Sequence, residues 1–408
     1  MKGPQLHRGA GVLFNPYAIG VGASVNTTPA HADGVAVKQL IHGRSGDRMP
    51  AINTSQFADL KCDSNDESAA RHRRWLRRGC WIASLLVGAL LIAVICSPSI
   101  ARWQLERQGW EIEFHDGEFR NRVPRFFEPW FADGASVSVS AVLVSDQDFR
   151  LLARIPRLMF LSIDDVAVSN SAFASIAELK ALVMLSITRA SIDGTGLAHL
   201  GRLPNLKHIK FQDVILDEPA LVGLSACRHL QCLQFEDSPV ADEHLSHLSR
   251  LPELTWLVLH RCQTGDHGLE QVAKIPELNV FLVISASISD DGVRHLRKLP
   301  RLKYLDLRNC AVTNLGVTQV VQSCRSLQTV GLSGTQCTDA IFPEIAALPE
   351  LEWFCLLGAP ITPDNLRELK RSPWLKELTL GHDKVDAIGP KDWEDLKRAK
   401  PNLQILFR

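Results

Sequence analysis

Apolar positions in the C-terminal two-thirds of the chain recur at a fixed spacing. Each copy follows the pattern L-x-x-L-x-L, with Ile, Val or Phe in place of some leucines, and successive copies step by 24 residues, with one step of 25. The first leucines of the ten clear copies are Leu158, Leu182, Leu206, Leu230, Leu254, Leu278, Leu302, Leu327, Leu351 and Leu375. A weaker copy lies upstream around Val137 and Val139, and a truncated one, PNLQIL, lies around Leu403. Self-similarity at such a period is typical of repeat architectures.

Each period predicts one strand and one short helix. The L-x-x-L-x-L stretch predicts a short strand whose leucines point inward, and the Leu-rich stretch after a short loop predicts a helix. An acidic or amide residue stands where each helix is expected to begin, and we expect it to cap that helix. These residues include Asp242, Asp266, Asp290, Asn314 and Asp339. No single unit buries its apolar face, so the stacked copies should form one continuous core.

The consensus LPxLxxLxLxxxxITDxGLxxL over residues 134–408 resembles the leucine-rich-repeat proteins. The resemblance implies an α/β solenoid with a curved parallel sheet on its concave side and short helices on its convex side. The order of tail, apolar span, aromatic segment (WQLERQGWEIEFHDGEF) and repeats also resembles single-pass membrane leucine-rich-repeat proteins of planctomycete-type bacteria. The repeats are similar, too, to the substrate-recruiting arms of F-box proteins, but no F-box-like helical segment precedes them.

One stretch ahead of the repeats has the character of a membrane span. Residues 79–101 carry no charge and are long enough to cross a hydrocarbon core of about 30 Å as a helix. Basic residues are denser before this stretch, in RHRRWLRR, than after it, so we expect a cytoplasmic N-terminus and exported repeats. A cleaved signal peptide is the alternative, but its leader would exceed the usual length of about 15–30 residues. An uncleaved signal anchor is therefore expected.

The segments on either side of the span differ in composition. Residues 1–78 show no sustained apolar period and are expected to form a disordered cytoplasmic tail. Residues 102–133 are rich in Trp and Phe, with a turn signal at Asp116 and Gly117 between two possible strands. We expect this segment to cap the first repeat; the alternative is an aromatic segment lying in the membrane interface.

The repeat register predicts which side chains reach the concave face. Positions flanking the inward leucines point outward, and equivalent positions of neighbouring strands form columns about 4.8 Å apart. One apolar patch with polar neighbours is then expected on three successive strands, and Trp353 belongs to a second, smaller patch. The first patch consists of Trp256, Val258, Val280, Leu282, Ile284 and Tyr304. We predict that this face binds a protein or peptide partner. The predicted contact residues are Trp256, Val258, His260, Val280, Leu282, Ile284, Tyr304, Asp306, Arg308 and Trp353.

Three other interpretations of the patch stay open. A loop or tail of the same chain covers it, or the strand register differs locally from the one assumed. The third is that the patch binds carbohydrate, because Trp256, Tyr304 and Trp353 are able to stack on sugar rings. For the whole protein, the alternatives to a recognition or scaffold role are a self-associating structural protein of the cell envelope and an adaptor similar to F-box arms.

Charge and motifs argue against several other functions. The formal net charge is zero, which does not favour nucleic acid as a partner. The sequence contains no nucleophile elbow, phosphate-binding loop, zinc-protease motif or dinucleotide fingerprint, so we expect no catalytic, cofactor-binding or metal-binding residues. The ten cysteines lack paired spacing, and we expect most of them to be single buried thiols.

The stretch HRCQTGDH, residues 260–267, gathers residue types that bind zinc. In register, however, His260 projects onto the concave face, Cys262 points into the core, Asp266 starts the helix and His267 follows it. Groups that point in different directions do not coordinate one ion. We therefore expect His260 to act as a partner contact.

Overall fold

The computed structural model describes residues 111–114, 135–140, 145–155, 157–192 and 194–408, all within the compact unit Val94–Arg408. The predicted tail (1–78) and the predicted span (79–101) lie outside the described residues, as does most of the predicted cap. None of the helices in the described ranges combines the length and the apolar character needed to cross a membrane.

The strands follow one another through the sheet in chain order. They are β1 (Glu111–Phe114), β2 (Ala135–Ser140), β3 (Leu158–Asp164), β4 (Met184–Thr188), β5 (His208–Gln212), β6 (Cys232–Glu236), β7 (Trp256–His260), β8 (Val280–Ile284), β9 (Tyr304–Asp306), β10 (Thr329–Gly331), β11 (Trp353–Leu356), β12 (Glu377–Leu380) and β13 (Gln404–Phe407). From β2 onward each strand pairs in parallel with the next, whereas β1 pairs with β2 in the antiparallel sense.

Between consecutive strands the chain forms short helices. The α-helices are α3 (Asp146–Leu152), α4 (Asn170–Ile176), α5 (Glu218–Leu224), α6 (Asp266–Val272), α7 (Asp290–Val293), α8 (Asn314–Ser323), α9 (Phe342–Ala346), α10 (Pro363–Glu368) and α11 (Pro390–Ala399). The 3-10 helices are η5 (Gly194–Arg202), η6 (Asp242–Arg250), η7 (Arg294–Lys298), η8 (Asp339–Ile341), η9 (Leu369–Arg371) and η10 (His382–Lys384).

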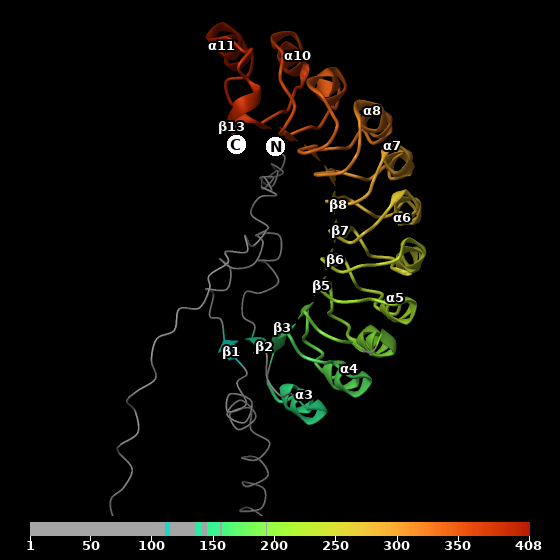
Figure 1. Ribbon diagram of the computed structural model, residues 1–408. Helices are drawn as coiled ribbons and strands as arrows, with labels where there is room; N and C mark the ends of the chain where they lie inside the picture. The colour runs from blue at the N-terminus through green and yellow to red at the C-terminus, as the bar shows by residue number, and fades with distance from the viewer. Residues whose placement is uncertain (1–110, 115–134, 141–144, 156, 193) are drawn as a thin grey trace, which may run out of the picture. The chain divides into compact units, whose positions relative to one another are not determined.

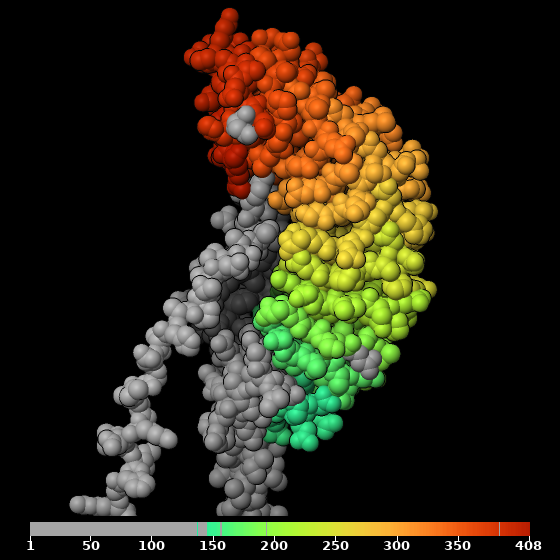
Figure 2. Space-filling view, in the orientation of Figure 1, coloured from blue at the N-terminus to red at the C-terminus, as the bar shows by residue number. Residues whose placement is uncertain are grey.

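The strands line the inner side of an arc and the helices form its outer side (Figure 1). Successive repeats stack directly on one another along this arc, as the space-filling view shows (Figure 2). The expected α/β solenoid, with a curved parallel sheet on its concave side and short helices on its convex side, is therefore confirmed. The weak upstream copy and the truncated copy form β2 and β13.

The core lies between the sheet and the helices and runs through every described repeat. The inward leucines are fully buried, among them Leu257 and Leu305, and the stacked rings of Phe211 and Phe235 lie 5.8 Å apart. The described cysteines are all free and buried, as the sequence predicted for most of the ten. Burying this much apolar surface is what stabilises a stack of units that cannot fold alone.

The acidic residues at the helix starts do not act as the sequence predicted. Asp266 and Asp290 are the first residues of their helices, and the caps precede them. Each carboxylate instead accepts two hydrogen bonds from the next repeat: Asp290 accepts from the backbone N–H of Thr313 at 2.8 Å and from its Oγ1 at 2.5 Å. Asp242, Asn314 and Asp339 make similar bonds to the following repeat. A cap would accept from a backbone N–H group of its own helix. The N–H groups that these carboxylates accept from belong to the following repeat instead.

This ladder of hydrogen bonds explains the glycine of the TDxGL motif. A Cβ atom added to Gly292 would lie 2.3 Å from Oδ1 of Asp266, and one added to Gly316 would lie equally close to Oδ1 of Asp290. The carboxylate of one repeat therefore occupies the space that a side chain would need in the next. The Asp and the Gly of the TDxGL motif keep their spacing because the Asp of one repeat lies against the Gly of the next.

Candidate partner-binding surface

The strand register confirms the predicted columns of concave side chains. Trp256 pairs with Val280 and Val280 with Tyr304, while Val258 pairs with Leu282 and Leu282 with Asp306. His260 pairs with Ile284. Trp353 belongs to the column of Tyr304, with Thr329 between them. The structure thus brings eight of the ten predicted contact residues onto the adjacent strands β7, β8 and β9. Arg308 lies in the turn after β9, and Trp353 lies on β11, beyond β10.

The exposure of these residues differs from the expected open patch. Trp256 exposes 4% of its surface, Tyr304 7% and Trp353 3%, and Val258, Leu282 and Asp306 are also buried. Val280, Ile284, His260 and Arg308 are half-buried. Adjacent strands lie about 4.8 Å apart, so bulky side chains at equivalent positions pack closely beside their neighbours.

The accessible part of the concave face lies at the carboxyl ends of the strands. The side chain at this position is half-buried in seven successive repeats, whereas the two columns before it are largely buried from β6 to β11. The seven residues are Asp164, Thr188, Gln212, Glu236, His260, Ile284 and Arg308. We call these seven residues the strand-end column. A partner that approaches the sheet meets this column first.

A ridge of left-handed backbone borders the strand-end column. The residue after each column position has a positive φ, and its N–H donates to a carbonyl of the next repeat, as Asp237 does to His260. These residues are Asp165, Arg189, Asp213, Asp237, Arg261, Ser285 and Asn309, followed by Gly334 and Gly358. Sequence analysis missed this ridge, although Asp and Asn, which tolerate this conformation, recur at the position.

Ion pairs fix polar groups along the ridge and the strand-end column, among them Arg189 with Asp164, whose Nη2 and Oδ2 lie 2.6 Å apart. Arg261 donates through Nε and Nη2 to the carboxylate of Asp237, and these hydrogen bonds lower the pKa of Asp237. Lys210 Nζ lies 2.8 Å from Glu236 Oε2. His260 lies beside Arg261, with 3.2 Å between its Nε2 and Arg261 Nη1. Burial, and then the Arg261 charge, lower the pKa of His260, which favours its neutral form.

The pair of Asp306 with Arg308 is buried more deeply. Asp306 exposes 1% of its surface, and Arg308 Nε lies 2.9 Å and 2.8 Å from its two oxygens. Burial raises the pKa of Asp306, while the charge and hydrogen bonds of Arg308 oppose that rise. The next strand has Gly331 opposite Asp306, and a Cβ there would lie 2.9 Å from the carboxylate. The absent side chain gives Asp306 room to orient Arg308.

The residues of HRCQTGDH separate as the register predicts. Cys262 is buried, its Sγ lies 3.1 Å from the carbonyl oxygen of Phe235, and burial raises its pKa to about 12. Asp266 accepts hydrogen bonds from Ser289, and His267 lies near Glu270 on α6. Nowhere in the described ranges do three His, Cys, Asp or Glu side chains gather in a way that would hold a metal ion.

No family model matches the sequence, and no curated protein matches it. Similar solved structures include an internalin from Listeria monocytogenes, 16% identical, over 60% of this chain and 86% of that one, with a TM-score of 0.39. Another, from the Rad7 and Elc1 complex in yeast, is 15% identical over 85% and 99% of the two chains, with a TM-score of 0.45. The plant peptide hormone receptor RGFR1 in complex with RGF2 is 12% identical over 67% and 47%, with a TM-score of 0.38.

Proposed function

We propose that this protein is a membrane-anchored leucine-rich-repeat recognition or scaffold protein that binds a protein or peptide partner through its concave sheet. The observation that supports this proposal most strongly is the strand-end column. It places half-buried side chains in a continuous row on the inner side of the arc, where the strands lie (Figure 1). A row of this kind suits an extended segment of a partner.

The buried aromatic residues act as the floor of this surface. Trp256, Tyr304 and Trp353 are held in place by packing, so the half-buried Val280 and Ile284 stand on a rigid base. Binding to side chains that are already ordered costs less conformational entropy. Apolar contacts at the centre of a polar rim are also the usual arrangement of a binding hot spot.

The charged groups beside the apolar residues supply selectivity. Asp306 orients Arg308, and Asp237 orients Arg261, so both guanidinium groups are held in fixed directions beside the strand-end column. Oriented charges discriminate between partners through complementary and like charges. The half-buried apolar residues of this surface, Val280 and Ile284, are aliphatic, and the aromatic residues are buried. Sugar rings stack on exposed aromatic faces, so a peptide fits this surface better than a carbohydrate.

The membrane anchor is the second part of the proposal. It rests on the uncharged stretch 79–101 and on the excess of Arg before it, which together favour an N-terminus in the cytoplasm and repeats outside. Reporter fusions at residues before 71 and after 107 are expected to report opposite sides of the membrane. Fusions that report the same side would remove the anchor from the proposal.

Site-directed photocrosslinking in the source cell tests partner binding by the concave face. A photoreactive residue at position 284 is expected to give discrete adducts, and the same residue at position 215 none. Ile215 is the matched control because it is apolar, 81% exposed and outside the concave columns. Equal crosslinking at both positions, or none at 284, would contradict the proposal.

A further inference from the structure

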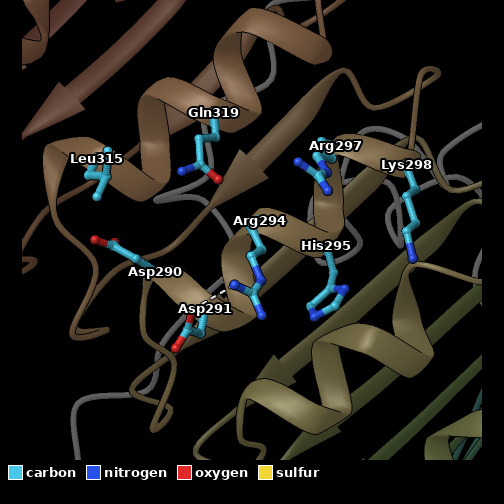
Figure 3. A pocket seen from close by; sticks show the side chains of 8 residues that line it. All are labelled: Asp290, Asp291, Arg294, His295, Arg297, Lys298, Leu315 and Gln319. Carbon is cyan, nitrogen blue, oxygen red and sulfur yellow. Dashed lines mark ion pairs between the residues drawn. The ribbon is translucent and has the colours of Figure 1, made fainter.

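The outer side of the arc contains a cleft that the concave surface does not use. It lies between the segment α7–η7 and the helix α8, with a volume of about 430 Å³. In Figure 3, Arg294, His295, Arg297 and Lys298 come from one side, and Leu315 and Gln319 come from α8 on the other. Pockets that bind organic ligands have volumes of about 300–1,000 Å³, so this cleft has room for more than a single inorganic anion.

The two carboxylates that line the cleft already have partners. Asp291 Oδ1 lies 2.9 Å from Arg294 Nη1, the ion pair drawn in Figure 3. Asp290 accepts hydrogen bonds from Thr313 as part of the ladder between repeats. Neither carboxylate therefore neutralises the remaining basic groups of the cleft.

Arg297 and Lys298 form no ion pair with any residue that the structure describes, and both are exposed. The equivalent of Lys298 one repeat earlier behaves differently, because Lys274 donates to Gln271 Oε1 at 2.7 Å. A basic residue near a helix end stabilises the helix dipole. Other helices have two basic residues in the last turn, such as His247 and Arg250 in η6 or Lys370 and Arg371 in η9, whereas η7 has three. These three are His295, Arg297 and Lys298.

Leu315 and Gln319 give the cleft a second chemical character. Leu315 is 65% exposed, although large apolar side chains are otherwise mostly buried in the described repeats. An amide and an aliphatic side chain opposite a basic wall fit a ligand that has both anionic and apolar groups. A peptide with Glu or Asp beside an aliphatic residue has this composition, whereas inorganic phosphate lacks the apolar part.

We propose that this outer cleft binds an acidic peptide segment of a partner, with Arg297 and Lys298 contacting its carboxylates and Leu315 its aliphatic side chain. The site is separate from the concave surface, so the two proposals stand or fall independently. Since exposed charges dominate the contact, the affinity should weaken as salt is added.

Fluorescence anisotropy with the purified full chain and a labelled Glu-Glu-Leu-Glu-Glu peptide tests the proposal. The double variant Arg297→Glu and Lys298→Glu is expected to bind at least about tenfold more weakly, a loss of about 1.4 kcal/mol. The matched control is Arg250→Glu with Lys274→Glu, which makes the same charge change at exposed positions of the two preceding repeats. This control is expected to lose less than about twofold of the affinity, as is appropriate for screened charges outside the cleft.

Three results would overturn the proposal. Equal losses in the two double variants would mean that binding follows overall charge. An unchanged affinity after Leu315→Ser would remove the apolar contact, and tighter binding to phosphatidylserine vesicles than to the peptide would identify a lipid surface. Each variant must retain the melting temperature of the parent, which shows that a lost affinity does not reflect unfolding.

Discussion

The ladder of hydrogen bonds at the helix starts and the columns of the concave face differ in how much their residues vary from repeat to repeat. At the helix starts the same chemistry returns in successive repeats: a carboxylate or amide of one repeat bonds to the backbone of the next, as Asp266, Asp290 and Asn314 do. On the concave face the residue changes at almost every strand, from Trp256 through Val280 to Tyr304. The residues that recur hold the repeats together, whereas the residues that vary are those that we propose contact a partner.

We call the buried residues that hold the repeats together the framework. Replacing a framework residue should have the largest effect on the free energy of unfolding. Phe281 is fully buried and lies in β8 between the column residues Val280 and Leu282. Phe281→Ala is expected to lower the free energy of unfolding by about 3–5 kcal/mol, because it removes a buried aromatic ring and leaves a cavity. The half-buried Val280→Ala should cost less than about 1 kcal/mol. Urea denaturation of both variants measures the difference, and similar costs would abolish the distinction between framework and column.

The close approach of Gly292 to Asp266 gives a smaller but more specific effect. Gly292→Ala is expected to cost about 1–3 kcal/mol, because the new methyl group overlaps the carboxylate. In an Asp266→Ala background the same change should cost much less, since the overlapping atoms are gone. A double-mutant cycle measured by urea denaturation gives this coupling. A cost of Gly292→Ala that is the same in both backgrounds would show that the ladder does not require glycine.

Asp306, a residue of the concave columns, is expected to make the free energy of unfolding depend on pH. Burial raises its pKa in the folded protein above the ordinary value of 3.8, so the folded state binds this proton more tightly than the unfolded chain does. The contribution of Asp306 is therefore favourable at low pH, and it decreases as the pH rises from near 3.8 through the folded pKa.

Asp306→Asn removes this titration. Relative to the parent, the variant is expected to gain stability as the pH rises through that interval, measured as urea midpoints at a series of pH values. A difference between parent and variant that does not change with pH would contradict the raised pKa. The variant also leaves Arg308 without its carboxylate partner, so it should weaken partner binding at every pH.

The smallest effect is expected on the ridge. Arg261 and Asp237 form an ion pair, but both side chains are partly exposed to solvent. Exposed pairs contribute about 0–1 kcal/mol. Arg261 also has a φ of 52°, which glycine adopts without strain. Arg261→Gly should therefore change the melting temperature little while it weakens partner binding. A large fall in the melting temperature would assign the ridge to the framework.

Much of the framework follows from the sequence, because a 24-residue period fixes the strand, the loop and the inward leucines together. The assignment of each concave residue to a column followed from the same period. The burial of Trp256 and Tyr304 did not follow, because exposure depends on neighbouring side chains as well as on the direction in which a residue points.

The ladder and the ridge could not be predicted from one repeat considered alone. Asp290 finds its hydrogen-bond donors in the next repeat, and Asp237 donates its N–H to a carbonyl of the following strand. Such contacts depend on how far one repeat is offset from the next, which the strand register establishes. The positive φ of Arg261 is a further consequence of this stacking, since arginine has no intrinsic preference for it.

Crosslinking of column variants tests most directly whether the concave face recognises a partner. A photoreactive residue at position 260 is expected to give a discrete adduct in the source cell, and Val280→Lys with Ile284→Lys should abolish it without changing the melting temperature. The matched control, Ile215→Lys with Val222→Lys, alters two exposed apolar residues outside the columns and should leave the adduct intact. An adduct that survives the column variant, or that disappears equally in the control, would contradict recognition by the concave sheet.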